Sequence, residues 1–198
     1  MFVQVMKGKT SDPTKLRSQA DRWQSEVRPG AVGFLGGTGG VADDGTFVLF
    51  ARLADEASAR ANSARPEQGA WWEQTVPCFD GEPTFRESSD VRLLLDGGSD
   101  DAGFVQVMEG RAVDRAKAEA FETPELLDQL RAARPELLGG LRVWFDGGAF
   151  ADVVYFTSED SAHQGESSSE FAEPQQEYLD LYKDVTFIDL RDPILNSP

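Results

Sequence analysis

The chain has 198 residues, of which 40% are hydrophobic, and a net charge of −16. So acidic a surface repels phosphate backbones and anionic lipids, and no apolar run reaches the ~20 residues of a membrane helix, so we expect neither nucleic acid nor membrane as a partner. The sequence enters an alternating apolar pattern at Phe2 without a signal-peptide pattern, and its single cysteine, Cys78, fits a reducing compartment; both features predict a cytoplasmic protein.

The first half of the chain alternates between strand and helix patterns. Asp12 followed by Pro13 is typical of a helix start, and Pro29-Gly30 is typical of a helix end. Alternating apolar residues predict strands, and apolar residues three or four apart predict helices. The predicted elements are a strand over 2–6, a helix over 12–28, strands over 31–35 and 46–53, helical segments over 54–64 and 66–79, and a strand over 84–87.

The stretch 36–45 is rich in glycine and resembles a phosphate-binding loop at first sight. Such a loop needs a helix after it, so that the helix N-terminus faces the phosphate, and here a strand pattern follows. The stretch also lacks the Gly-Lys-Ser/Thr triplet. We therefore expect a long, flexible hairpin loop that serves as a lid.

The second half repeats the first. The segment 2–9 (FVQVMKGK) returns 102 positions later at 104–111 (FVQVMEGR), with six of eight letters identical, and Thr84-Phe85 returns at the same offset as Thr186-Phe187. An internal repeat of this kind has to be recognised before the elements are assigned. The predicted elements of the second half are a strand over 104–108, a helix from Thr123-Pro124, strands over 141–145 and 150–156, helical segments after Ser158 and around Tyr178, and a strand over 185–190.

Each half reads as βαββαβ, the ferredoxin-like arrangement, in which both helices lie on one face of an antiparallel sheet. The predicted fold class is α+β, with two ferredoxin-like repeats that form a single-chain pseudo-dimeric α/β barrel. We assign residues 1–95 to the first repeat, 96–103 to a linker and 104–198 to the second repeat, and expect the strand over 91–95 to reach across to the second repeat. One chain is then a monomeric pseudo-dimer, with further self-association left open.

Three features carry a resemblance to a known family: the duplicated βαββαβ plan, the repeated Phe-Val-Gln-Val-Met-x-Gly-[Lys/Arg] strand, and Asp55-Glu56-Ala57 after the third strand. With them the chain resembles tandem-repeat members of the dimeric α/β-barrel superfamily, and most nearly the antibiotic-biosynthesis-monooxygenase-like domains. The segment 61–72 is similar to actinobacterial members with two such copies. The resemblance implies the fold and a choice of activities, since the superfamily includes cofactor-free oxygenases, haem-handling enzymes and small-molecule binders.

The residues from 62 to 86 supply the candidate ligand site. Neighbouring residues on a helix point about 100° apart, so Trp71 and Trp72 cannot both point inward. We expect Trp72 to join the core and Trp71 to line a cleft. The candidate ligand-binding residues are Asn62, Arg65, Trp71, Trp72 and Arg86. The alternative is that both tryptophans only pack and that Arg65 and Glu67 form a surface ion pair.

Metal and cofactor sites have little support in the sequence. One histidine and one cysteine do not make a zinc or non-haem iron site, so we expect no metal and no cofactor. Haem ligation by His163 and a glyoxalase-like metalloenzyme are weaker alternatives. Gln4 and Gln106 occupy equivalent places on apolar strand faces; we favour mutual or backbone hydrogen bonds for them over a polar contact in a cavity.

Two functional hypotheses follow. The first is a cofactor-independent monooxygenase-like enzyme that acts on a small aromatic or quinol substrate. The second is a non-catalytic small-ligand-binding or structural protein. If the chain has a ligand pocket, we expect it in the first repeat between the sheet and the helical region 62–79, with the stretch 36–45 at its mouth and a small aromatic ligand as the partner.

Overall fold

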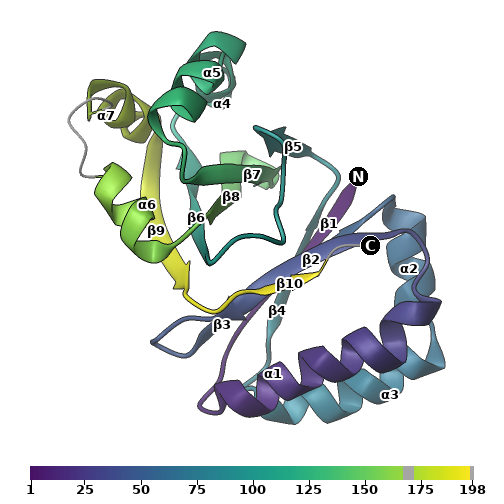
Figure 1. Cartoon of the computed structure of the whole chain (residues 1–198). Coiled ribbons are helices and arrows are strands. Elements are labelled where there is room, and N and C mark those ends of the chain that lie inside the picture. The colour runs from purple at the N-terminus through teal and green to yellow at the C-terminus, as the bar shows by residue number, and fades with distance from the viewer. Residues whose placement is uncertain (167–171, 197–198) are drawn as a thin grey trace. The chain divides into compact units, whose positions relative to one another are not determined.

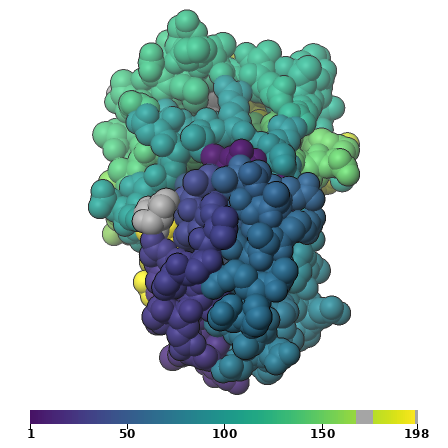
Figure 2. All heavy atoms as spheres, turned by 90° about the vertical axis from the view of Figure 1, so that its right-hand side faces the viewer, coloured from purple at the N-terminus to yellow at the C-terminus, as the bar shows by residue number. Residues whose placement is uncertain are grey.

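The computed structural model describes residues 1–166 and 172–196, which form two compact units. Unit 1 comprises Met1–Asp90 together with the chain from Asp192 onward, and unit 2 comprises Val91–Arg191. Each unit contains one five-stranded sheet in which all neighbouring strands run antiparallel (Figure 1). In the space-filling view, unit 1 (purple to blue) forms one compact body (Figure 2).

Unit 1 follows the expected βαββαβ order and adds one strand from the end of the chain. Its sheet has the strand order β10-β2-β3-β1-β4. A π-helical turn at Trp23–Val27 and 3-10 turns at Arg28–Gly30 and Val76–Cys78 extend the helices. The elements are β1 (Phe2–Lys9), α1 (Pro13–Arg22), β2 (Phe34–Val41), β3 (Thr46–Leu53), α2 (Glu56–Ser63), α3 (Pro66–Thr75), β4 (Thr84–Ser88) and β10 (Ile194–Asn196).

The helices of unit 1 begin where the sequence predicts. The Asp12 carboxylate accepts a hydrogen bond from the backbone N–H of Lys15 at 3.0 Å, and Asp55 does the same for Ser58 at 2.7 Å. These side chains satisfy N–H groups that have no partner within the helix. Pro66 begins α3 at the position where a proline costs no hydrogen bond.

The glycine-rich stretch is a strand, and the predicted hairpin loop and lid are wrong. Strand β2 contains four of these glycines and pairs with β3 on one side and β10 on the other. A Cβ atom at Gly39 would lie 2.6 Å from the carbonyl oxygen of Val48, and one at Gly36 would lie 2.8 Å from that of Asn196. Glycine is present because neighbouring backbones approach too closely for a side chain. The turn itself is short and covers residues 42–45.

Unit 2 repeats the plan. Its sheet has the strand order β5-β7-β8-β6-β9. Strand β7 begins earlier than predicted, again across two glycines, and β9 begins at Tyr182, three residues before the predicted strand over 185–190. The elements are β5 (Val91–Leu94), β6 (Phe104–Ala112), α4 (Arg115–Phe121), α5 (Pro124–Ala133), β7 (Leu137–Trp144), a 3-10 turn (Asp146–Gly148), β8 (Ala149–Phe156), α6 (Glu159–Glu166), α7 (Ala172–Asp180) and β9 (Tyr182–Leu190).

Two short strands complete the sheets at points distant in sequence. Strand β5 follows the first repeat in the chain but pairs with β7 of unit 2, as expected for the strand over 91–95. Strand β10, which the sequence analysis missed, pairs with β2 of unit 1. The fold class is confirmed as α+β with two ferredoxin-like repeats, a duplicated plan that fits a pseudo-dimer. Across residues 1–166 and 172–196, no helix is long and apolar enough to cross a membrane.

The strand registers match positions between the two units. Gln4 of β1 lies opposite Glu87, and Gln106 of β6 lies opposite Asp189. Met6 lies opposite Leu49, and Met108 lies opposite Asp152. The pairing of β2 with β3 places Gly39 opposite Leu49, and the pairing of β7 with β8 places Arg142 opposite Asp152. The equivalent pairs are therefore Gln4 and Gln106, Met6 and Met108, Gly39 and Arg142, Leu49 and Asp152, and Glu87 and Asp189.

Candidate functional site

Unit 1 contains a cavity of about 440 Å³, a size that suits a small organic ligand. It lies on the side of the sheet that faces α1 and α3, which run side by side (Figure 1). Its apolar lining includes Met6, Leu16, Trp23, Phe34, Phe47, Leu49, Trp71, Trp72, Phe85 and Ile194. Its polar lining includes Gln4, Asn62, Gln68, Thr75, Glu87 and Asn196. The cavity lies where we predicted it, between the sheet and the helical region 62–79.

Both predicted tryptophans line the cavity, but the order of their burial is reversed. Trp71 is the more buried of the two, with 9% of its surface exposed, and its indole N–H donates to the carbonyl of Gln19 at 2.7 Å. Trp72 is partly buried and packs edge-on against Phe85, with ring centroids 5.5 Å apart. Trp71 thus lines the cavity as expected and Trp72 also packs against the core, but Trp71 is the more buried of the two rings, which is the reverse of the expected order.

A third tryptophan, Trp23, also lines the cavity. The Trp23 indole N–H donates to the Gln68 side chain at 2.9 Å, and its ring lies 5.0 Å from that of Phe34. The Trp71 and Trp23 indoles thus each have their single donor satisfied. Two of the aromatic rings in the cavity wall are consequently held in place by hydrogen bonds.

The three polar candidates have different positions. Asn62 lines the cavity, but its side-chain amide exchanges two hydrogen bonds of 2.8 Å with the backbone of Val32. Arg65, within the described part of the chain, does not line the cavity; it donates to the carbonyl of Val27 at 2.9 Å and lies 3.8 Å from Glu67. Arg86 likewise does not line it, because alternate residues of β4 face opposite sides and the cavity takes the other side.

Gln4 and Glu87 form a polar part of the cavity lining, called the polar end below, and neither was among the predicted site residues. Gln4 Nε2 donates to Glu87 Oε1 at 2.8 Å, and Arg60 donates to both carboxylate oxygens at 3.2 and 2.8 Å. Burial opposes ionisation of Glu87, but the hydrogen bonds from Arg60 and Gln4 outweigh it and hold the pKa of Glu87 below its usual value. Glu87 is therefore an ionised acceptor at neutral pH.

The repeated glutamines provided the signal for this site. In unit 2, Gln106 donates to Asp189 at 3.0 Å, as Gln4 does to Glu87 in unit 1. The favoured interpretation, that the two glutamines bond to each other or to backbone, is wrong. A glutamine conserved between the two copies on an apolar face indicates a polar partner on the adjacent strand.

Unit 2 carries a buried ionic network on the equivalent sheet face. The side chain of Arg142 is 1% exposed, and its guanidinium contacts the Asp152 carboxylate through two hydrogen bonds of 2.7 and 2.6 Å. It also donates to Glu122 Oε1 at 2.7 Å. Glu122 Oε2 lies 3.0 Å from Arg92 Nη1, close enough for an ion pair but without a hydrogen bond.

Two tyrosines complete this network. Arg142 donates to the hydroxyl of Tyr182 at 2.6 Å and to that of Tyr178, which itself donates to Asp152 at 3.1 Å. Burial opposes the charge on Arg142, but the Asp152 carboxylate outweighs it and raises the arginine pKa. Burial also raises the pKa of Glu122, and raises that of Tyr182 to about 12.

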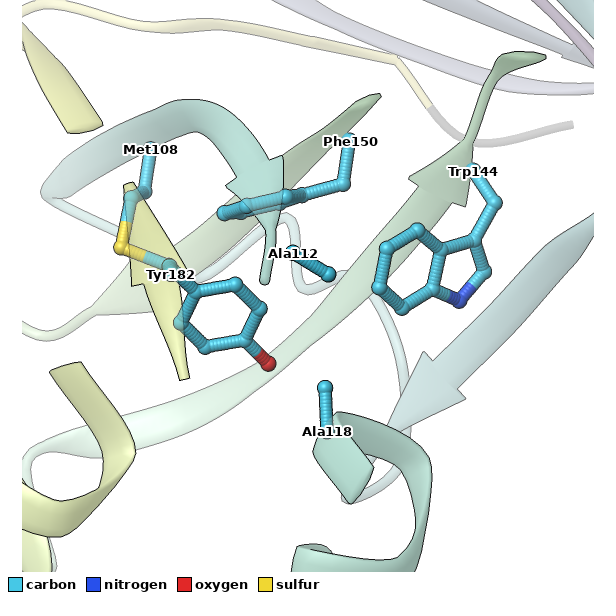
Figure 3. Close-up of a cluster of buried hydrophobic side chains, with 6 residues drawn as sticks. All are labelled: Met108, Ala112, Ala118, Trp144, Phe150 and Tyr182. Atoms are coloured by element: carbon cyan, nitrogen blue, oxygen red, sulfur yellow. The ribbon is translucent and has the colours of Figure 1, made fainter. Parts of the chain in front are cut away.

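The network lies on the sheet face equivalent to the cavity face of unit 1, and its Asp152 occupies the position of the cavity-lining Leu49. Phe150 and Tyr182 pack with ring centroids 4.7 Å apart, and the Arg142 guanidinium lies over both rings at 5.0 Å. Figure 3 shows these two rings converging with Trp144. Unit 1 has Gly39 and Leu49 where unit 2 has Arg142 and Asp152, so the two copies have diverged at this face.

Glu159, His163 and Asp189 bring three potential metal-ligand atoms within 4.8 Å of one another. Their charges already have partners in the protein. Arg191 donates to Glu159 at 2.8 Å, and His163 lies 3.0 Å from Glu166. This cluster is equivalent to the Arg60–Glu87 group of unit 1, because Ser158 begins α6 as Asp55 begins α2.

Comparison with known proteins establishes the fold. No protein-family model and no curated protein matches the chain. A "putative monooxygenase" from Lactobacillus acidophilus matches with a TM-score of 0.71 at 12% identity, covering 98% of each chain. A "putative monooxygenase" from Fusobacterium nucleatum matches with a TM-score of 0.77 at 12% identity, covering 99% of this chain and 94% of that one. An "anthrone oxidase-like protein" matches with a TM-score of 0.62 at 10% identity, covering 99% and 89%. The chain thus shares the fold of monooxygenase-like proteins, as its resemblance to the dimeric α/β-barrel superfamily implied.

Proposed function

We propose that the protein is a cofactor-independent monooxygenase-like enzyme that binds a small aromatic or quinol substrate in the cavity of unit 1. The observation that carries the proposal is the cavity itself, which is lined by aromatic rings and by a small number of polar groups at one end. Oxidation of a quinol or anthrone without a cofactor requires a site that holds an electron-rich ring away from water and accepts a proton from it. The monooxygenase names of the two bacterial neighbours agree with the proposed type of reaction, and the anthrone oxidase-like name of the third agrees with the proposed substrate class.

The residues of the chain supply binding and proton acceptance in this proposal. Trp72 and Phe85 offer ring faces to an aromatic substrate, and Trp71 and Trp23 close the wall behind them. Glu87 is the ionised carboxylate of the cavity lining and the proton acceptor of this proposal; because Arg60 and Gln4 hold its pKa low, it is a weak base that releases the proton again at neutral pH. Asn62 contributes shape, because its amide is already bonded to backbone.

Oxygen uptake tests the proposal. We expect oxygen consumption with reduced naphthoquinones or anthrone at rates above the uncatalysed reaction, and loss of the excess rate in Ala20→Trp, which places a large ring in the cavity. Asp189→Asn is the control for a substitution outside the cavity, because Asp189, the unit 2 equivalent of Glu87, does not line it. Uptake at the uncatalysed rate with every substrate, despite binding, contradicts the enzymatic assignment.

A non-catalytic ligand-binding protein is the second candidate, and a specific observation favours it. Of the two predicted groups that could orient a developing oxyanion, Asn62 lines the cavity but is bonded to the backbone of Val32, and Arg65 lies outside the lining and is bonded to the backbone of Val27. The fold also occurs in a structure named as a major regulator of staphylococcal pathogenesis, with a TM-score of 0.57 at 11% identity, covering 96% of this chain and 98% of that one. Tight binding of an aromatic ligand without turnover supports this candidate.

A further inference from the structure

The polar end of the unit 1 cavity offers a hydrogen-bond acceptor. Glu87 receives three hydrogen bonds, one from Gln4 and two from Arg60. A carboxylate has roughly four acceptor positions, so Glu87 has capacity for about one more donor. Gln4 Nε2, the cavity-lining donor closest to it, is already directed at the carboxylate at 2.8 Å.

The charge at this end favours a neutral donor over an ion. Arg60 balances the negative charge of Glu87 at 2.8 Å, so a ligand needs no positive charge to bind beside it. A carboxylate or phosphate on the ligand would be repelled by Glu87 and by Glu56, which lies 3.0 Å from the same guanidinium. A hydroxyl group supplies one donor and carries no charge, which matches the remaining capacity of Glu87.

The aromatic wall and this acceptor lie on the same face of one strand. Phe85 and Glu87 are alternate residues of β4, so their side chains project from the same side of the sheet about 7 Å apart. Trp72 packs against Phe85 and extends the apolar wall. A planar ring against Phe85 and Trp72 would thus present its substituent toward Glu87.

We propose that the ligand of the unit 1 cavity is a phenol or hydroquinone whose hydroxyl group donates a hydrogen bond to Glu87. Glu87 is then the specificity-determining residue, and Gln4 and Arg60 are positioning residues that hold the carboxylate ionised and oriented. This inference rests on the proposed function, because it assumes that the cavity is the ligand site. It adds the functional group that the ligand must carry.

Unit 2 provides the internal comparison. Asp189 is the register equivalent of Glu87 and accepts the equivalent hydrogen bond from Gln106. The face beside it holds the Arg142–Asp152 ion pair where unit 1 has Gly39 and Leu49. Changing Asp189 thus perturbs the same kind of glutamine–carboxylate pair without touching the cavity.

A matched pair of ligands tests the inference in the unaltered protein. Titration calorimetry with 1-naphthol and 1-methoxynaphthalene compares two ligands that differ in whether their oxygen donates a hydrogen bond. We expect 1-naphthol to bind about tenfold more tightly, the value of one hydrogen bond to a charged acceptor. We expect the cation 1-naphthylmethylammonium to bind no more tightly than 1-naphthol. Equal affinity for 1-naphthol and its methyl ether, or tightest binding of the cation, overturns the hydroxyl assignment and leaves the cavity as the ligand site. Binding of none of the three overturns the proposed function as well.

The variants locate the effect. Glu87→Leu should reduce the preference for 1-naphthol over its methyl ether to about twofold or less, whereas Asp189→Leu should keep it near tenfold. The ratio of two affinities measured on one variant does not depend on the fraction of protein that is folded, so it separates recognition from stability. A Glu87→Leu protein that keeps the full preference shows that another group accepts the hydroxyl, and this contradicts the assignment.

Discussion

Arg142 is the residue whose substitution we expect to lower the folding stability of the protein most. It is buried and holds two carboxylates, Asp152 and Glu122, away from water. Removing one partner of a buried ion pair leaves a buried charge without compensation, whereas replacing both partners by apolar residues is often neutral. The equivalent positions of unit 1, Gly39 and Leu49, show that this sheet face tolerates apolar residues.

We expect Arg142→Met to lower the free energy of unfolding by about 3–5 kcal/mol. Asp152→Leu added to it should recover part of this loss, because it removes the unpaired carboxylate. Urea unfolding followed by circular dichroism measures the two single variants, Arg142→Met and Asp152→Leu, and the double variant. Arg115→Met is the control, since Arg115 lies over the same Trp144 ring at 4.6 Å but is exposed and should cost less than ~1 kcal/mol. A double variant as unstable as the sum of the two single variants contradicts the interpretation.

His163 is the residue whose protonation should make the stability of unit 2 depend on pH. Its hydrogen bond to Glu166 raises its pKa above the usual value, with further support from Asp189 and Glu159, whose charge Arg191 partly balances. A histidine whose pKa is raised on folding stabilises the protein below its unfolded pKa of about 6.5, and this contribution disappears as pH rises through the folded pKa. Unit 1 has the permanently charged Arg60 at this place.

We expect the imidazole of the single histidine to titrate above 6.5 by NMR, and Tm to fall slightly as pH rises through that value. His163→Arg reproduces the unit 1 arrangement and should remove the dependence in this range. An imidazole that titrates at or below 6.5, or an Arg variant with the same pH profile, is inconsistent with the role assigned to His163.

Among the elements, those defined by local signals were predictable and those defined by distant neighbours were not. Asp12-Pro13 and Asp55 mark helix starts through side-chain caps to residues three positions on, so the sequence alone reveals them. Strand β2 was predicted too early and too short, over 31–35, because glycine has a low strand propensity; the glycines are present because β3 and β10 approach closely.

The candidate site follows the same division. The aromatic wall was predictable because Trp71 and Trp72 stand out in a helix pattern, although the order of their burial was not. The Gln4–Glu87 pair joins residues on neighbouring strands whose register the sequence does not reveal. The same holds for Arg142 and Asp152, which meet across β7 and β8. Arg65 and Arg86 were predicted as site residues because they are charged. Arg65 instead donates to the backbone carbonyl of Val27, and strand alternation turns Arg86 to the face of β4 away from the cavity.

For the whole molecule, the chain crosses from unit 1 to unit 2 after Asp90 and returns after Arg191. The returning segment adds β10 to the sheet of unit 1, contributes Ile194 and Asn196 to the cavity, and pairs Asp192 with Arg17 at 2.5 Å. Unit 1 is therefore complete only when residues from both ends of the sequence are present.

We expect truncation after Arg191 to open the edge of β2 and to weaken ligand binding in the cavity. Hydrogen exchange should show faster exchange of β2 amides in the truncated chain, because their partner strand is gone. The amides of β7 are the matched control, since β5 covers that strand in unit 2 and is unchanged. Equal protection of β2 in the two chains would show that β10 does not stabilise the sheet.

The discontinuity of unit 1 also sets an order of events during synthesis. A ribosome releases the four strands β1 to β4 first and then all of unit 2, which takes on the order of ten seconds at ordinary rates, before β10 emerges. Throughout that interval the nascent chain carries a sheet with an unpaired, glycine-rich edge, the kind of surface that recruits other strands. Unit 2, whose strands are contiguous in the chain, can pair all of its strands before the last strand of unit 1 has been synthesised.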